Sequence, residues 1–165
     1  RKGRKPHWNA DSGVIWNLRS PGLRPDGWTS ADAAGLPIFP GLAKVDDVAS
    51  GPLSHALRVT FSSTRDAWIH PASHCAGDTS NPNAPAMGTR LRLRGDYDLS
   101  GFGGRARLIA VGLKRYGMIV ADNGSNWYIS GTSDRRWNDE DLDQLKSIPG
   151  SAFEVVRSEA PAHVC

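Results

Sequence analysis

The feature that most constrains the fold of this chain is the stretch 114–131, in which Asn123-Gly124 lies between two runs of strand-forming residues. Asn-Gly tolerates positive φ at both positions, so between two such runs it is the strongest short-range signal of a β-hairpin. We therefore expect paired strands at 118–121 and 127–130. Their turn would display polar and aromatic side chains at one end of a sheet, among them Asp122, Asn126, Trp127 and Tyr128.

Glycine and proline are frequent along the chain, with 18 Gly and 11 Pro in 165 residues. So many turn-forming residues in a chain of one-domain length favour a mainly β fold over a helical bundle. We predict a β-sandwich or jelly roll with two short helices and long loops. From the period of their apolar residues, the further strands are expected at 13–18, 54–62, 66–70, 90–99 and 153–157, and the helices at 104–116 and 138–146.

The chain is expected to form one domain. Residues 1–11 are predicted to be a flexible basic arm, residues 12–158 the β-sandwich domain, and residues 159–165 a tail. The net charge is +3, and Arg1-Lys2-Gly3-Arg4-Lys5 carries four positive charges. Because the rest of the chain is then close to neutral, we expect no nucleic-acid partner. No apolar run approaches the ~18 residues of a membrane span, so no membrane partner is expected either.

Several long motifs together resemble a poorly characterised family of secreted bacterial and fungal proteins. The motifs are LRPDGWTSADAAGLPIFPGL at 23–42, HALR at 55–58, PAMGTRLRL at 85–93, LKRYGM at 113–118, ADNGSNWYISG at 121–131 and RWND at 136–139. Some similar proteins are linked to carbohydrate-binding modules, so the resemblance implies secretion and a polysaccharide or oligosaccharide partner. Such proteins usually extend further at the N-terminus. The resemblance is therefore compatible with this chain being the C-terminal part of a larger precursor, whose missing N-terminal segment would be a further partner.

Three residues are candidates for acid–base catalysis. Glycosidic bond cleavage needs two carboxyl groups at one bond, one of them with a pKa raised by burial. Asp122, at a strand end, is the first candidate and Asp32, in the long loop 21–51, is the second. His55 lies in phase with apolar residues of the 54–62 strand, so it could act as a general base beside a carboxylate. Alternatively, Asp122 bonds only its own turn, Asp32 is a helix-turn charge and His55 is a core histidine.

A second set of residues could bind the ligand. Indole and phenol rings stack on the apolar faces of sugars, and amides and amines bond their hydroxyl and carboxylate groups. The predicted ligand-binding residues are Asn123, Asn126, Trp127, Tyr128 and Lys114. A glycan-cleaving hydrolase or lyase is one reading of this pattern. A non-catalytic carbohydrate-binding module is the alternative, and a structural or assembly protein is a third.

The remaining candidates are cysteine and histidine residues. Cys75 and Cys165 form an even count that is compatible with one disulfide and an oxidising compartment, but the sequence leaves open whether they pair. His70 and His74, four residues apart and followed by Cys75, are ligand types for a transition metal. The alternative is a polar loop beside a disulfide. No other cofactor is expected.

Overall fold

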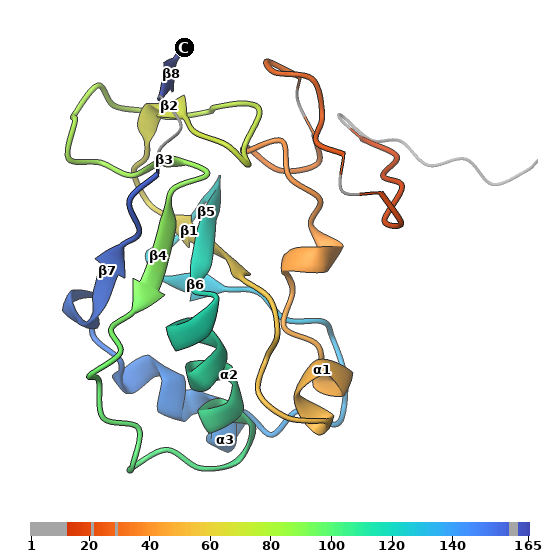
Figure 1. The fold of residues 1–165 in the computed structure, drawn as a ribbon, viewed down its shortest axis with the longest axis vertical. Coiled ribbons are helices and arrows are strands. Elements are labelled where there is room, and N and C mark those ends of the chain that lie inside the picture. The colour runs from red at the N-terminus through yellow and green to blue at the C-terminus, as the bar shows by residue number, and fades with distance from the viewer. Residues whose placement is uncertain (1–12, 21, 29, 159–161) are drawn as a thin grey trace, which may run out of the picture.

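The computed structural model describes residues 13–20, 22–28, 30–158 and 162–165, and a five-stranded mixed sheet forms its centre (Figure 1). The predicted basic arm at 1–11 lies outside the described residues. The strands are β1 (Leu57–Phe61), β2 (Arg65–Trp68), β3 (Ala86–Met87), β4 (Arg90–Leu93), β5 (Met118–Asn123), β6 (Tyr128–Ile129), β7 (Phe153–Val155) and β8 (His163–Val164). The helices are α1 (Val45–Ala49), α2 (Gly104–Arg115) and α3 (Asp139–Asp143), with 3₁₀ turns at Phe39–Gly41, Gln144–Ser147 and Gly150–Ala152.

The large sheet has the strand order β6-β1-β5-β4-β7. β1 and β5 pair in parallel, with Leu57 opposite Met118, and the other pairs of this sheet are antiparallel. A small sheet with the order β3-β2-β8 lies at the other end of the molecule from α2 and α3 (Figure 1). The prediction of a mainly β fold is thereby confirmed. A β-sandwich or jelly roll is not confirmed, because those folds are built from antiparallel strands, whereas β1/β5 and β2/β3 are parallel.

The predicted hairpin around Asn123-Gly124 is wrong, because β1 lies between β5 and β6. The chain leaves β5, passes around the end of β1 and returns on its other side. The Gly124 N–H donates to the Phe61 carbonyl, and the Trp127 N–H donates to the Thr60 carbonyl. The turn residues therefore wrap a third strand, which a local sequence signal does not reveal.

Both predicted helices are present. α2 ends where Gly117 adopts a φ of 70°, the left-handed conformation that glycine adopts at little cost. α3 begins after Asn138, whose side chain accepts hydrogen bonds from the backbone N–H groups of Glu140 and Asp141. This is the N-cap that the sequence predicts.

Two ends of the described chain differ from the prediction. Residues 13–18 form no strand. The C-terminal segment, predicted as a tail, forms β8 and pairs with β2, so that His163 lies opposite Trp68. A disulfide joins Cys75 to Cys165 and fixes this strand to the loop that follows β2.

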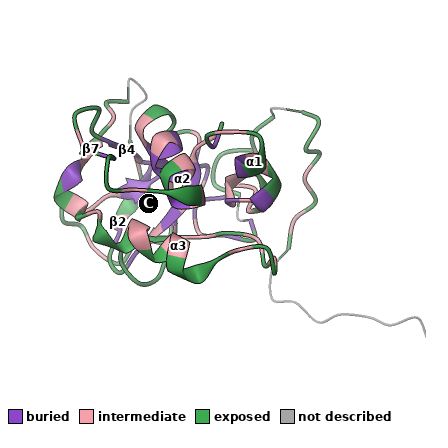
Figure 2. Ribbon diagram, turned by 90° about the horizontal axis from the view of Figure 1, so that it is seen from below, coloured by how far each residue is buried: buried purple, intermediate pink, exposed green. Residues whose placement is uncertain are grey.

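The hydrophobic core lies between the large sheet and α2. Leu57 and Val59 alternate with more polar neighbours along β1, and they share one core with Ile109 and Leu113 of α2. Figure 2, viewed from below, shows the buried residues gathered towards the centre, with exposed residues on the outer side of α3. No helix among the described residues combines the length and apolar character that a membrane crossing requires.

Candidate functional site

Arg58 on β1 brings together two of the predicted catalytic carboxylates. Its Nη2 atom lies 3.2 Å from Oδ2 of Asp122 on β5 and 3.6 Å from Oδ2 of Asp32 in the long loop. The parallel pairing of β1 with β5 places Asp122 opposite Thr60, two residues from Arg58 along the same strand. The loop is held by Asp32 itself, whose Oδ1 accepts a hydrogen bond of 2.8 Å from the Leu36 N–H. Two carboxylates 90 residues apart in the chain thus share one guanidinium group.

The two carboxyl groups have unequal surroundings. The Asp32 side chain is completely buried, whereas that of Asp122 is 35% exposed. Burial raises the pKa of Asp32 to about 6, although the hydrogen bond from Leu36 and the charge of Arg58 oppose this increase. Oδ2 of Asp32 accepts no hydrogen bond from the described residues. Asp32 is therefore a carboxyl group that exchanges its proton near pH 6 next to a more accessible partner.

A cavity of about 160 Å³ adjoins this cluster. Asp32 and Arg58 supply its charged groups, and Pro37, Pro40 and Ile119 are among its apolar residues. The pair of carboxyl groups is suited to proton transfer, since one gives up its proton near neutral pH and the other lies at the same guanidinium group.

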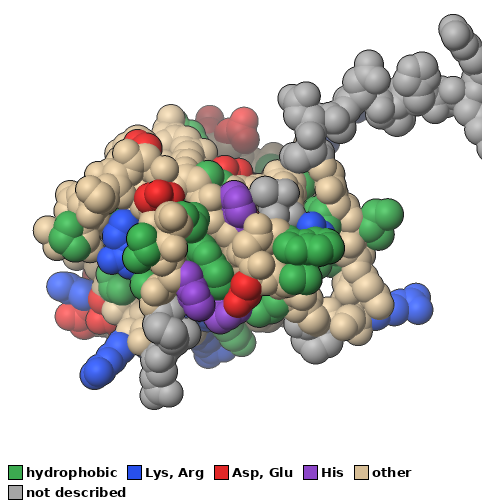
Figure 3. Space-filling view, turned by 90° about the horizontal axis from the view of Figure 1, so that it is seen from above, with side chains coloured by type: hydrophobic (Ala, Val, Ile, Leu, Met, Phe, Trp, Pro, Cys, Tyr) green, Lys and Arg blue, Asp and Glu red, His purple; other side chains and the backbone are tan. Residues whose placement is uncertain are grey.

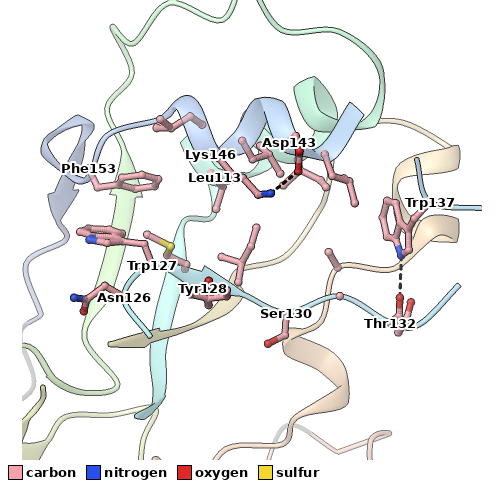
Figure 4. Close-up of a pocket in the computed structure, with 18 residues that line it drawn as sticks. Leu113, Asn126, Trp127, Tyr128, Ser130, Thr132, Trp137, Asp143, Lys146 and Phe153 are labelled. Carbon is pink, nitrogen blue, oxygen red and sulfur yellow. Dashed lines mark hydrogen bonds and ion pairs between the residues drawn. The ribbon is translucent and has the colours of Figure 1, made fainter. Parts of the chain in front are cut away.

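A larger groove of about 540 Å³ lies along β6, between α2 and the segment that follows α3 (Figure 4). Trp127 and Phe153 stand at one end of it, with their ring centroids 5.2 Å apart. Trp137 stands at the other end, where its Nε1–H donates to the Thr132 carbonyl at 2.9 Å. The floor between these rings is apolar, and it consists of Ile109, Leu113, Met118, Ile129, Leu142, Leu145 and Ile148.

Polar groups lie along the groove's rim. Lys146 forms an ion pair of 2.6 Å with Asp143 near the middle of the groove. Asn126 and Ser130 lie on the opposite side, next to Tyr128, which is 65% exposed. The groove therefore combines aromatic ends, an apolar floor and a polar edge, which is the usual composition of a site for an organic ligand.

The backbone around Trp127 explains why its ring lines the groove. Trp127 has a φ of 61°, which is unusual for a residue other than glycine. Its ring packs edge-on against Phe61 at a centroid distance of 4.9 Å, and Trp127 as a whole residue remains 38% exposed. The turn thus holds the indole in a fixed position at the sheet edge.

The carboxylate pair and the groove lie on opposite faces of the large sheet. Met118 lines the groove, and the next residue, Ile119, lines the cavity beside Asp32. Successive side chains of a strand point to opposite faces. The sequence predicts Asp122 and Trp127 at one site, but the structure places them in two separate sites.

Three other predicted site residues are engaged within the fold. Nε2 of His55 lies 3.1 Å from Oδ2 of Asp47 on α1, and His55 precedes β1 instead of continuing its buried face. The Asn123 amide donates to the Ala76 carbonyl and accepts a bond from the Thr64 hydroxyl. Nζ of Lys114 donates to the Gly95 and Tyr97 carbonyls of the loop before α2. These contacts fix loops, and none of the three residues lines the two cavities described above.

The two histidines predicted as metal ligands make different contacts. Nδ1 of His74 lies 3.1 Å from the Ala33 carbonyl oxygen. Nε2 of His70 lies 3.7 Å from Oδ2 of Asp26. His70 therefore lies near a carboxylate, whereas His74 contacts a backbone carbonyl, so the two histidines do not share a contact partner.

Sequence reasoning missed Arg58, Phe153 and Lys146. Arg58 alternates with Leu57 and Val59, so its place on the polar face of β1 is readable from the sequence, but its two carboxylate partners are not. The tertiary fold alone brings Phe153 against Trp127 and places Lys146 at the same groove. Comparisons with protein-family models, with curated proteins and with solved structures found no match, so the family resemblance stays a prediction.

Proposed function

We propose that this chain is a secreted protein that binds polysaccharide in the groove beside β6. The observation that carries the proposal is the groove itself, which has aromatic rings at both ends and polar side chains along its edge. A chain of pyranose rings has flat apolar faces and hydroxyl groups at its edges. Trp127 and Trp137 would stack on the faces, while Asn126 and the pair Asp143–Lys146 would bond the hydroxyl groups. The disulfide supports secretion, because such bonds persist in oxidising compartments.

The groove favours binding over cleavage. Glycosidases use two carboxyl groups that face one glycosidic bond. The described residues that line the groove include one carboxylate, Asp143, and it is paired with Lys146. We therefore assign the groove to recognition of the polysaccharide.

Affinity electrophoresis through gels that contain soluble plant, fungal or bacterial glycans tests this proposal. We expect at least one glycan to retard the protein. Trp127→Ala should weaken this retardation about tenfold, since an aromatic contact contributes about 0.5–1.5 kcal/mol beyond the area it buries. Trp28→Ala is the matched control, because Trp28 is an exposed indole that does not line the groove. Unretarded migration in every glycan, or equal losses in the two variants, would refute the proposal.

The pair Asp32 and Asp122 favours glycan cleavage as a second candidate function. The raised pKa of Asp32 keeps a proton available near pH 6, so Asp32 would act as the general acid and Asp122 as the base or nucleophile. If so, Asp122→Asn should abolish the release of reducing ends from the glycan and leave its binding in the groove unchanged. Asp96→Asn, which removes an exposed carboxylate elsewhere, should keep full activity. Reducing-end release by Asp122→Asn at the wild-type rate would exclude this role.

A further inference from the structure

Asp26, His70 and His163 come together from three distant segments of the chain. One ligand atom of each residue lies within 4.8 Å of the ligand atoms of the other two. Figure 3 looks down on the end of the molecule that carries β2 and β8, and it shows imidazole and carboxylate side chains next to one another at the surface. Two imidazoles and one carboxylate are ligands that zinc and other first-row transition metals bind.

The distance between His70 and Asp26 suits a shared ion better than a direct bond. Nε2 of His70 and Oδ2 of Asp26 are 3.7 Å apart, which is too far for a hydrogen bond. Two ligands that each bind zinc at about 2.0–2.2 Å with tetrahedral angles lie about 3.4 Å from each other. A shift of a few tenths of an ångström would therefore bring both atoms within bonding distance of one ion.

Both imidazoles pack against the indole of Trp68. The His163 ring stacks on Trp68 with a centroid distance of 4.1 Å and an interplanar angle of 10°. The His70 ring meets the edge of the same indole at 5.2 Å. Pairing of β8 with β2 and the disulfide at Cys165 fix the backbone of His163. One indole thus orients both rings, as the surrounding groups of a metal site commonly do.

The backbone beside Asp26 is bonded to the segment that carries His70. The Gly27 N–H, directly after Asp26, donates to the Ser73 carbonyl, which lies three residues beyond His70. The side chains of Asp26 and His70 remain 53% and 40% exposed, so solvent reaches the cluster. An ion bound there would keep at least one coordination position open to water or to a further ligand.

We propose that Asp26, His70 and His163 form a binding site for a divalent transition metal ion of the zinc type. This site is separate from the groove and from the Asp32 cluster, and it does not depend on the proposed function. It differs from the pair His70 and His74 that the sequence predicts, because Asp26 and His163 take the place of His74. The simpler alternative is an ion pair between protonated His70 and Asp26.

Isothermal titration of the chelator-treated, disulfide-bonded full chain with Zn²⁺ tests the proposal. We expect one ion to bind per chain. Asp26→Asn and His70→Gln should each weaken binding at least about tenfold, since loss of a group that merely supports a ligand already costs about 10–100-fold in metal affinity. Asp26→Asn is the decisive variant, because Asn has the same shape as Asp and the side chain is exposed, so the substitution should not disturb folding. Near-UV circular dichroism should show that both variants are folded.

Two controls complete the experiment. His74→Gln and His55→Gln remove imidazoles outside the cluster and should leave the zinc affinity unchanged. A chain loaded with Co²⁺ should show visible d–d absorption that Asp26→Asn alters and His74→Gln does not. Absence of zinc binding, or wild-type affinity in both Asp26→Asn and His70→Gln, would overturn the proposal in favour of the ion pair.

Discussion

Replacing Asp32 by Asn should change how the free energy of unfolding depends on pH. In the folded protein, burial raises the pKa of Asp32 to about 6, against 3.8 for an aspartate in the unfolded chain. Between these two values the folded state holds a proton on Asp32 that the unfolded state has released. The free energy of unfolding of the wild type therefore decreases as pH rises through this window, and the loss is nearly complete by about pH 7.

The magnitude follows from the difference between the two pKa values. About two pKa units correspond to about 3 kcal/mol, because one unit is 1.36 kcal/mol. At about pH 5 the folded carboxyl is about nine-tenths protonated and the unfolded carboxyl less than one-tenth. The contribution of Asp32 should thus have a slope of about −1.2 kcal/mol per pH unit there.

Urea denaturation followed by tryptophan fluorescence measures this effect at intervals from about pH 4 to pH 8. The loss of stability over this range should be about 2.4 kcal/mol smaller in Asp32→Asn than in the wild type, since about 0.6 kcal/mol of the full effect is already lost at pH 4. Asn keeps an oxygen that can accept the bond from Leu36, so the loop should remain in place. Asp96→Asn is the control for removing a carboxylate from the surface. If the wild-type and Asp32→Asn profiles run parallel, the buried carboxyl does not have the raised pKa that the acid–base hypothesis requires.

Two further predictions concern local structure and are measured by urea denaturation at one pH. Gly117→Ala should destabilise the protein by at least about 1 kcal/mol, because φ is 70° and a Cβ there would overlap a backbone carbonyl of β4. Gly101→Ala, where nothing lies near the added Cβ, should change stability by less than about 0.5 kcal/mol, and equal effects at both positions would contradict this reasoning. Asn138→Ala should lower the free energy of unfolding by about 1 kcal/mol, because the N–H groups of Glu140 and Asp141 lose the side-chain oxygen that accepts their hydrogen bonds. An unchanged urea midpoint would show that this cap is dispensable.

The helices were predictable because their signals are local. The apolar period of α2 and the glycine after it lie within one stretch of chain, as do Asn138 and the first turn of α3. The strand order was not predictable in the same way. Asn123-Gly124 permits a turn, but the sequence around it does not show that β1 lies between β5 and β6, the two strands that this turn connects. Pairing partners are set by burial across the whole fold.

In the candidate sites, too, the residue types are predictable from local sequence, whereas the contacts between them are not. Residue type and position in the sequence predict Asp32 and Asp122 as candidates, but their meeting at Arg58 depends on the parallel pairing of β1 with β5. Trp127 was expected at a sheet edge, whereas its partner Phe153 belongs to a strand at the opposite edge of the sheet. His163 lay in a segment predicted to be a tail, so nothing in the sequence linked it to His70.

The bond between Cys75 and Cys165 has a consequence for proteolysis. It spans 90 positions, and α2, α3 and six of the strands lie inside the covalent ring that it closes. A protease that cuts once within this ring would leave both pieces attached, so the nicked protein would migrate as one species on a gel without reductant. Thiol treatment would release a fragment whose size reports which exposed loop was cleaved.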